Sequence, residues 1–239
     1  MSDLRGKTAI VTGAGRGLGR ATATQLGKAG VRVAIVARSA DEIAQTAADI
    51  AAAGGEAIAV CADVTDPNQV EQLFDRVAHE YGPTNVLVNN AGIGLFGAVE
   101  ALSPRDLDSI LEVNLKATVY CSQQAFRHMR QNGSGHIINV VSTSGRVGRA
   151  RESGYAASKW AVAGFTESIR AEGKPLGIRV TSFCPGGMNT SFWNTASGQA
   201  LQPDSASFMS ADQVARLLLE IIRVPETMVV DEIVIRRFG

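Results

Sequence analysis

The sequence has few residues of the kinds that build metal centres and disulfide frameworks. Its 239 residues include only three cysteines and three histidines, and Cys61, Cys121 and Cys184 lie far apart. No Cys-x-x-Cys pair or histidine ladder is present, which disfavours a zinc site and a catalytic triad built on histidine. We therefore expect no metal, and we expect the cysteines to be small core residues in a reducing compartment.

Net charge and long apolar runs are lacking as well. Lys and Arg total 23, Asp and Glu total 23, and the formal net charge is +0. No long-range attraction therefore draws the chain to nucleic acid or to anionic lipid. No apolar run approaches the about 20 residues that cross a bilayer, and residues 1–7 are too polar for a signal peptide. These absences predict a cytoplasmic protein that binds neither nucleic acid nor membrane.

What the chain does contain is a regular alternation of two kinds of segment. Continuously apolar runs rich in β-branched residues, as expected of strands covered on both faces, occupy residues 8–11, 33–36, 57–60, 86–88, 137–141 and 178–181. Stretches of helical character occupy residues 19–29, 40–53, 67–80, 107–130, 154–172 and 211–223. Asp66-Pro67 and Ser103-Pro104 are start signals for the third and fourth of these helices. This order predicts a single doubly wound α/β domain over residues 1–239, a Rossmann fold of three α/β/α layers with six or seven parallel strands.

A glycine-rich segment directly follows the first predicted strand and opens the first predicted helix. Residues 12–19 read TGAGRGLG and fit the pattern Thr-Gly-x-x-x-Gly-x-Gly. Glycines in this place let backbone amides and the positive end of the helix dipole approach a pyrophosphate without Cβ obstruction. No Walker lysine follows, so a dinucleotide is favoured over a nucleoside triphosphate. The predicted cofactor-binding residues of this segment are Gly13, Gly15, Arg16, Gly17, Leu18 and Gly19.

The end of the second predicted strand indicates which dinucleotide binds. The run from Val36 to Ser39 has no carboxylate at the place where NAD-binding folds hold the ribose 2′-hydroxyl. Arg38 can instead pair with a 2′-phosphate through charge-assisted hydrogen bonds, and Arg16 adds a second cation. These residues favour NADP(H) over NAD(H). The alternative is that both arginines are ordinary surface residues.

Three side chains further along the sequence predict an acid-base site. Tyr155 and Lys159 stand four residues apart near the start of a long apolar helix, so they share one helix face. A phenol has an unperturbed pKa of about 10, and we expect the ammonium to lower the pKa of Tyr155 by about three, toward working pH. Ser142 follows a predicted strand, at the carboxyl edge where open α/β sheets bind ligands.

With these motifs the sequence resembles the short-chain dehydrogenase/reductase family in its single-domain form. The resemblance covers nearly the whole chain and includes Asp63-Val64, Asn89-Asn90-Ala91-Gly92, Asn114 and Pro185-Gly186. It implies that Asp63 and Val64 contact the adenine and that Asn90, Ala91 and Gly92 line the cofactor cleft. It also implies that Pro185, Gly186 and Thr190 lie toward the nicotinamide.

The resemblance also implies the reaction. Tyr155 would exchange a proton with the oxygen of a carbonyl or secondary alcohol while hydride moves to or from a nicotinamide. Ser142 would hydrogen-bond the same oxygen, and Lys159 would hold the nicotinamide ribose. Asn114 would support a water that leads protons to solvent, or would simply satisfy backbone groups in a bent helix. The implied protein is an NADP(H)-dependent oxidoreductase of small molecules that forms a homotetramer or dimer.

The motifs leave the substrate open. Phe192 and Trp193 predict a lid over an apolar group, or else an amphipathic turn packed on the core, within a loop at residues 189–210 that we expect to be mobile. Arg146, Arg149 and Arg151 form a cationic run near the predicted mouth, which recruits an acidic carrier or a carboxylated substrate, or is merely solvated. Similarity to 3-oxoacyl-[acyl-carrier-protein] reductases ends before the C-terminus, so reduction of a 3-oxoacyl thioester is an alternative. A non-catalytic dinucleotide sensor and a nucleotide-sugar epimerase are less favoured.

Overall fold

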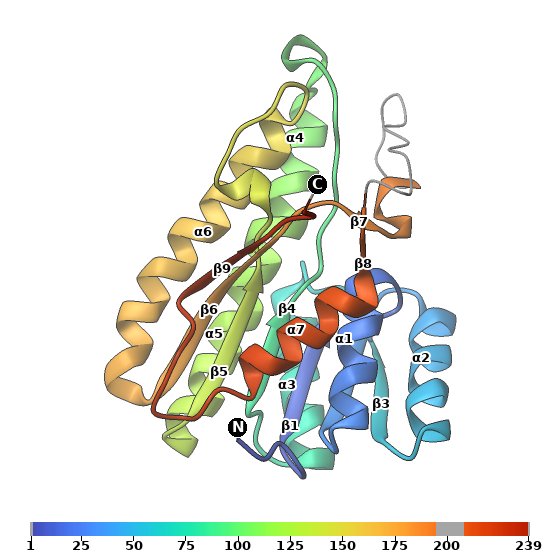
Figure 1. Ribbon diagram of the computed structural model, residues 1–239, viewed down its shortest axis with the longest axis vertical. Coiled ribbons are helices and arrows are strands. Elements are labelled where there is room, and N and C mark those ends of the chain that lie inside the picture. Colours follow the sequence, from blue (N-terminus) through green and yellow to red (C-terminus); the bar gives the residue numbers. More distant parts are fainter. Residues whose placement is uncertain (1, 195–207, 239) are drawn as a thin grey trace.

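The computed structural model describes residues 2–194 and 208–238, and its centre is a parallel β-sheet (Figure 1). Seven strands are hydrogen-bonded in the order β3-β2-β1-β4-β5-β6-β9. Their bounds are β1 Thr8–Thr12, β2 Arg32–Ala37, β3 Glu56–Cys61, β4 Val86–Asn89, β5 Gly135–Val140, β6 Ile178–Pro185 and β9 Glu232–Ile235. The predicted fold class, a doubly wound Rossmann-type sheet of six or seven parallel strands, is confirmed.

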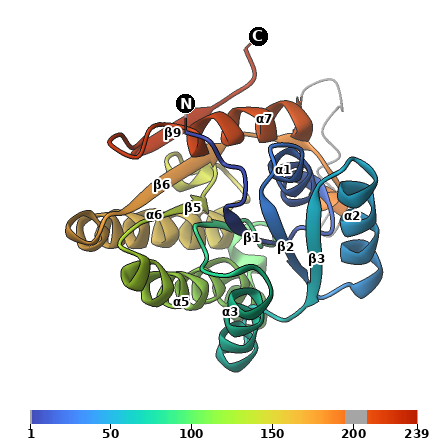
Figure 2. The same ribbon diagram turned by 90° about the horizontal axis from the view of Figure 1, so that it is seen from below.

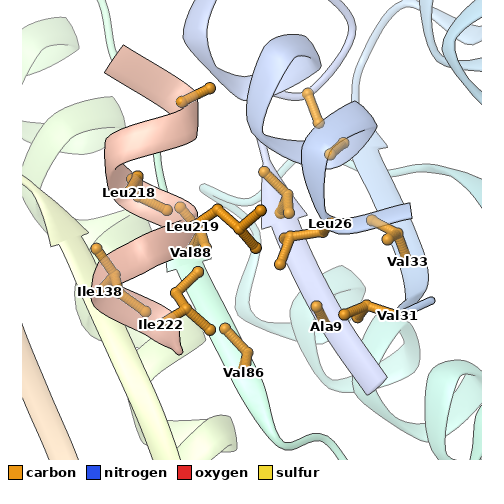
Figure 3. Packing of buried hydrophobic residues seen from close by; sticks show 14 of the residues in the cluster. Ala9, Leu26, Val31, Val33, Val86, Val88, Ile138, Leu218, Leu219 and Ile222 are labelled. Atoms are coloured by element: carbon orange, nitrogen blue, oxygen red, sulfur yellow. The ribbon is translucent and has the colours of Figure 1, made fainter. Parts of the chain in front are cut away.

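Helices cover both faces of the sheet (Figure 2). One face carries α1 Gly17–Lys28, α2 Ala40–Ala52 and α7 Ala211–Ile222, and the other carries α3 Pro67–Tyr81, α5 Ala117–Asn132 and α6 Ser153–Gly173. Leu219 of α7 and Leu26 of α1 pack above Val88 of β4 in the first of these layers (Figure 3). Burial of each such aliphatic side chain stabilises the fold by about 1.5–3 kcal/mol, which holds the helices against the sheet.

Local signals set where several helices begin. The Asp66 side chain accepts a hydrogen bond from the Asn68 amide at 2.9 Å, and Pro67 is the first residue of α3. Ser103 caps the next helix, α4 Pro104–Leu111, in the same way through the Asp106 amide at 3.1 Å. Both caps satisfy amides that the first turn of a helix leaves without partners. The predicted starts at Asp66-Pro67 and Ser103-Pro104 are therefore correct.

The structure corrects the sequence analysis in two places. The helix predicted over residues 107–130 is interrupted, because α4 ends at Leu111 and a π-helical turn, Glu112–Lys116, joins it to α5. The third strand is not covered on both faces, because β3 forms an edge of the sheet. Cys61 at its end is consequently exposed, whereas Cys121 and Cys184 are buried as expected. Within the described ranges, no helix is long and apolar enough to span a membrane.

The strand order determines where a ligand site forms. The chain passes from β1 outward to β2 and β3, then returns to place β4 on the other side of β1. The loops after β1 and β4 therefore run in opposite directions and leave a crevice at the carboxyl edge. The short strands β7 Met188–Asn189 and β8 Met209–Ser210 pair above the same edge. Residues 195–207, which include most of the loop predicted to be mobile, lie outside the described residues.

Candidate active site

A cavity of about 720 Å³ lies at the carboxyl edge of the sheet. The segments that follow β1, β2, β3, β4, β5 and β6 all contribute to its wall. Every residue that the sequence analysis assigned to the site lines this cavity, with the exception of Gly19 and Asn114. The tertiary structure thus brings together residues that lie up to 177 positions apart, from Gly13 to Thr190.

Close backbone packing explains the glycines after β1. A Cβ on Gly19 would lie 2.3 Å from the Gly13 carbonyl oxygen and 2.6 Å from Asn90 Nδ2, so no larger residue fits. Gly13 and Gly17 have φ values of 63° and 55°, a conformation that favours glycine. The Asn90 amide group donates to the Thr12 and Gly13 carbonyls at 2.9 and 3.2 Å. The turn therefore presents backbone rather than side chains to the cavity, as a dinucleotide pyrophosphate requires.

Charged side chains lie beside this turn, at the ends of β2 and β3. Arg38 Nη1 is 4.0 Å from Asp63 Oδ2, and the Arg38 side chain remains 71% exposed. The Asp63 carboxylate is itself held by the Thr65 amide and hydroxyl at 3.0 and 2.8 Å. Both charged residues line the cavity together with Arg16 and with Glu42, which the sequence analysis missed. Glu42 lies in the first turn of α2, four residues after Arg38. This spacing is the sequence signal that would have identified Glu42.

Ser142 has an unusual backbone conformation where the chain leaves β5. Its φ of 154° and ψ of 160° are rare for a residue with a side chain and occur mainly at functional sites. Its Oγ accepts a hydrogen bond from the Ser144 amide at 3.1 Å. The Ser144 hydroxyl donates to Glu152 at 2.7 Å and accepts from Arg149 at 3.0 Å. This network fixes the turn that orients the Ser142 hydroxyl.

The same network changes the interpretation of the cationic run. Arg149 is engaged with Ser144 and Glu152, and Arg146 forms an ion pair with Glu232 of β9. Two of the three arginines thus have partners within the protein. The pairing of these two arginines argues against recruitment of an acidic carrier by this run.

Burial dominates the electrostatics of Tyr155 and Lys159 in α6. It raises the pKa of Tyr155 to about 12, although a hydrogen bond with Ser142 acts in the opposite direction. It also lowers the pKa of Lys159 to about 8. Lys159 Nζ donates to the Val140 carbonyl at 3.0 Å and lies 5.8 Å from the centroid of the Tyr155 ring. The prediction that the pKa of Tyr155 falls toward working pH is therefore wrong for this structure, because desolvation of the phenol raises it.

Asn114 stands behind the cavity wall, in the π-helical turn. Its side chain is fully buried. Its amide nitrogen donates to the Ile93 carbonyl and to Ser158 Oγ, each at 3.0 Å, and its oxygen accepts from the Ile93 amide at 2.8 Å. The side chain thus satisfies the backbone after β4, which was the alternative role, while support of a proton-conducting water stays a prediction.

Aromatic rings from three segments form the remaining wall. Trp193 is stacked between Phe208, with ring centroids 5.1 Å apart, and Phe96, at 5.7 Å. Trp193 was predicted as part of a lid over an apolar group, whereas Phe208 was missed because nothing in the local sequence links it to Trp193. Within the part of the chain that the structure describes, no group of three or more His, Cys, Asp or Glu residues is placed to hold a metal ion.

Comparison with known proteins agrees with this geometry. The family model described as short chain dehydrogenase matches residues 7–200. The ketoacyl reductase HetN of a Nostoc strain is 34% identical over 96% of this chain and 80% of its own. Cis-4-hydroxycyclohexanecarboxylate dehydrogenase of Sinomonas cyclohexanicum is 41% identical over 77% of this chain and 74% of its own.

Solved structures agree as well. A metagenomic short-chain oxidoreductase in complex with NADP has a TM-score of 0.86 and 30% identity over 100% of both chains. The glycine turn, the crevice between β1 and β4 and the pair Tyr155 and Lys159 thus occur in a chain whose whole length follows this fold. The protein is a member of the short-chain dehydrogenase/reductase family, an oxidoreductase that acts on carbonyl and alcohol groups.

Proposed function

We propose that this enzyme is an NADP(H)-dependent oxidoreductase that interconverts a carbonyl and a secondary alcohol, with Tyr155 as the group that gives and takes the proton. The main support is that Tyr155 and Ser142 line the same cavity as the glycine turn and Arg38. A nicotinamide dinucleotide, when bound, supplies or accepts the hydride. The glycine turn fits such a cofactor because Gly13, Gly15 and Gly17 line the cavity and have no side chain to obstruct it.

The protein groups supply the proton and the hydrogen bonds. A phenol whose pKa is about 12 keeps its proton throughout the neutral range, so Tyr155 is ready to donate to a carbonyl oxygen. Ser142 Oγ accepts from the Ser144 amide and its hydroxyl hydrogen-bonds Tyr155, so it stands beside the phenol, where it is able to stabilise negative charge on the substrate oxygen. In the oxidation direction, the Lys159 ammonium one helical turn away favours loss of the phenolic proton.

Cofactor preference rests on Arg38. Its exposed guanidinium stands at the end of β2 beside Asp63, where a 2′-phosphate is able to pair with it. The structural relative in complex with NADP supports the same choice. The cytoplasmic location and the homo-oligomer, tetramer or dimer, that the family resemblance implies stay predictions, which cell fractionation and light scattering test.

Arg38→Asp is expected to weaken NADP⁺ binding about 10- to 100-fold, because it removes charge-assisted hydrogen bonds of about 1.5–3 kcal/mol and places a second carboxylate beside Asp63. NAD⁺ binding should change far less. Titration calorimetry of both cofactors without substrate measures the two dissociation constants. Arg76→Asp is the matched control, since Arg76 is half-exposed, pairs with Glu80 and does not line the cavity. An unchanged ratio of the two affinities contradicts the role of Arg38.

A screen of NADPH oxidation tests the reaction class. Ketones, quinones, sugars and 3-oxoacyl thioesters are supplied separately, and absorbance of NADPH is followed together with the alcohol product. We expect NADPH consumption with at least one ketone. Turnover confined to 3-oxoacyl thioesters favours the alternative of a thioester reductase. NADPH binding without consumption by any carbonyl supports the dinucleotide sensor and contradicts the proposal.

A further inference from the structure

Among the described residues, aromatic rings form one wall of the cavity beside Tyr155, and Ser142, Arg149 and Glu152 also line that cavity. The Phe96 ring meets the Tyr155 ring edge-on at 5.4 Å, and the Phe192 ring lies 6.0 Å from it. The indole N–H of Trp193 donates to the Met188 carbonyl at 2.9 Å, so this side chain offers the cavity its ring and no donor. A substrate group that adjoins the reacting carbonyl therefore meets mainly aromatic carbon on this side.

Two glycines make room for these rings. A Cβ on Gly94 would lie 2.7 Å from Phe192 and 2.8 Å from Phe96, and a Cβ on Gly187 would lie 2.2 Å from the Phe208 ring. Neither glycine has the positive φ that would itself require glycine. The ring contacts, and not the backbone conformation, explain why both positions lack a side chain. The chain is thus built at two separate positions to bring aromatic rings to this wall.

From this wall we infer the substrate class: a ketone, or the corresponding secondary alcohol, whose carbonyl carbon belongs to an apolar carbocycle. This inference rests on the proposed function and names its substrate. A hydrocarbon ring buries its faces against Phe96, Trp193 and Phe208 and gains both apolar burial and ring contacts. A polyhydroxylated chain would lose its hydrogen bonds to water against these rings, and the rings offer no replacement.

The test compares three carbonyl compounds with NADPH. We expect kcat/KM for 2-tetralone to exceed kcat/KM for cyclohexanone. We expect kcat/KM for dihydroxyacetone to be at least about 100-fold lower than kcat/KM for 2-tetralone. Phe208→Ala should lower kcat/KM for 2-tetralone about tenfold and affect dihydroxyacetone much less, because the smaller substrate makes fewer ring contacts. Phe126→Ala is the matched control, since Phe126 lies on α5, packs partly buried against the core and does not line the cavity.

Fluorescence gives a readout independent of turnover, because the chain has two tryptophans. Trp160 is 51% exposed on α6 and does not line the cavity. In Trp160→Phe, Trp193 is the only tryptophan, and binding of 2-tetralol to the NADPH complex, a pair between which no hydride moves, should change its emission. In Trp193→Phe, Trp160 is the only tryptophan, and the same addition should leave its emission unchanged.

The possible outcomes separate the two proposals. The carbocyclic substrate class is overturned if kcat/KM for dihydroxyacetone equals or exceeds that for 2-tetralone. It is also overturned if Trp193 emission does not change when 2-tetralol is added. If polar ketones are then reduced in a reaction that Tyr155→Phe abolishes, the proposed function stands and only the substrate class fails. If NADPH binds and no carbonyl is reduced, both fail.

Discussion

Tyr155→Phe is expected to lower kcat for carbonyl reduction by about 10³-fold and to leave NADPH affinity within about twofold. The substitution removes the hydroxyl that we propose as the proton donor to the substrate oxygen, and general acid catalysis contributes about 10²–10⁴-fold. It keeps the ring that packs against Phe96 at 5.4 Å, so the wall of the cavity should persist. Steady-state turnover with 2-tetralone and calorimetric titration with NADPH provide the two measurements.

A second tyrosine provides the control for this variant. Tyr81 ends α3 and does not line the cavity, so Tyr81→Phe removes a phenolic hydroxyl at a place with no role in the reaction. Its turnover should match that of the unaltered enzyme. Full activity in Tyr155→Phe would exclude Tyr155 as proton donor, and loss of both activity and NADPH binding would indicate a structural defect instead of a chemical one.

Acid should destabilise this protein through His136. The imidazole is 1% exposed in β5, its Nε2 lies 2.8 Å from Thr181 Oγ1, and its Nδ1 has no hydrogen-bond partner among the described residues. Burial lowers the pKa of His136 to about 3, and the charge of Arg179 acts in the same direction. A histidine in the unfolded chain has a pKa of about 6.5. Protonation therefore favours the unfolded chain.

The pH window follows from these two pKa values. Above about pH 6.5 the imidazole is neutral in both states and its contribution to stability is complete. Between about pH 6.5 and pH 3 only the unfolded chain takes up this proton, so the free energy of unfolding falls by up to about 1.4 kcal/mol per pH unit. We expect His136→Gln to lack this slope, so the stability difference between the two proteins should shrink by about 2 kcal/mol between pH 6.5 and pH 5.

Urea denaturation at several pH values measures this effect. His79→Gln is the control, because His79 is exposed on α3, and its stability should follow that of the unaltered protein at every pH. A difference between His136→Gln and the unaltered protein that stays constant from pH 7.5 to pH 5 would show that the imidazole titrates alike in both states. The buried position of His136 would then have no consequence for acid stability.

Much of the site was predictable because its signals are local. The glycine turn must follow a strand and open a helix, and residues 12–19 meet that requirement within a single short segment. Ser142, Tyr155 and Arg38 were found because they stand at strand ends or at the start of a helix, and parallel strands bring such ends to one edge. Helix starts at Asp66 and Ser103 were correct because caps act within three residues.

The errors concern burial and contacts between distant segments. The pKa of Tyr155 rises because the fold removes the phenol from water, which the spacing to Lys159 does not reveal. Cys61 is exposed because β3 lies at the edge of the sheet, and strand order is a property of the whole chain. Phe208 and Trp193, whose rings stack, stand on either side of residues 195–207 in the sequence, so no local pattern links them.

The sequence by itself determined most of the order of strands and helices, and it supplied the predicted dinucleotide turn and the candidate acid-base side chains. These follow from apolar periodicity, from glycine stereochemistry and from the chemical types of residues at element ends. Only the tertiary structure decided three features. They are the raised pKa of Tyr155, the hydrogen bonds of the buried Asn114 side chain, and the aromatic wall from which we infer a carbocyclic substrate. Each of those depends on which groups are withdrawn from water and which surfaces meet, and both are set only when the helices close on the sheet.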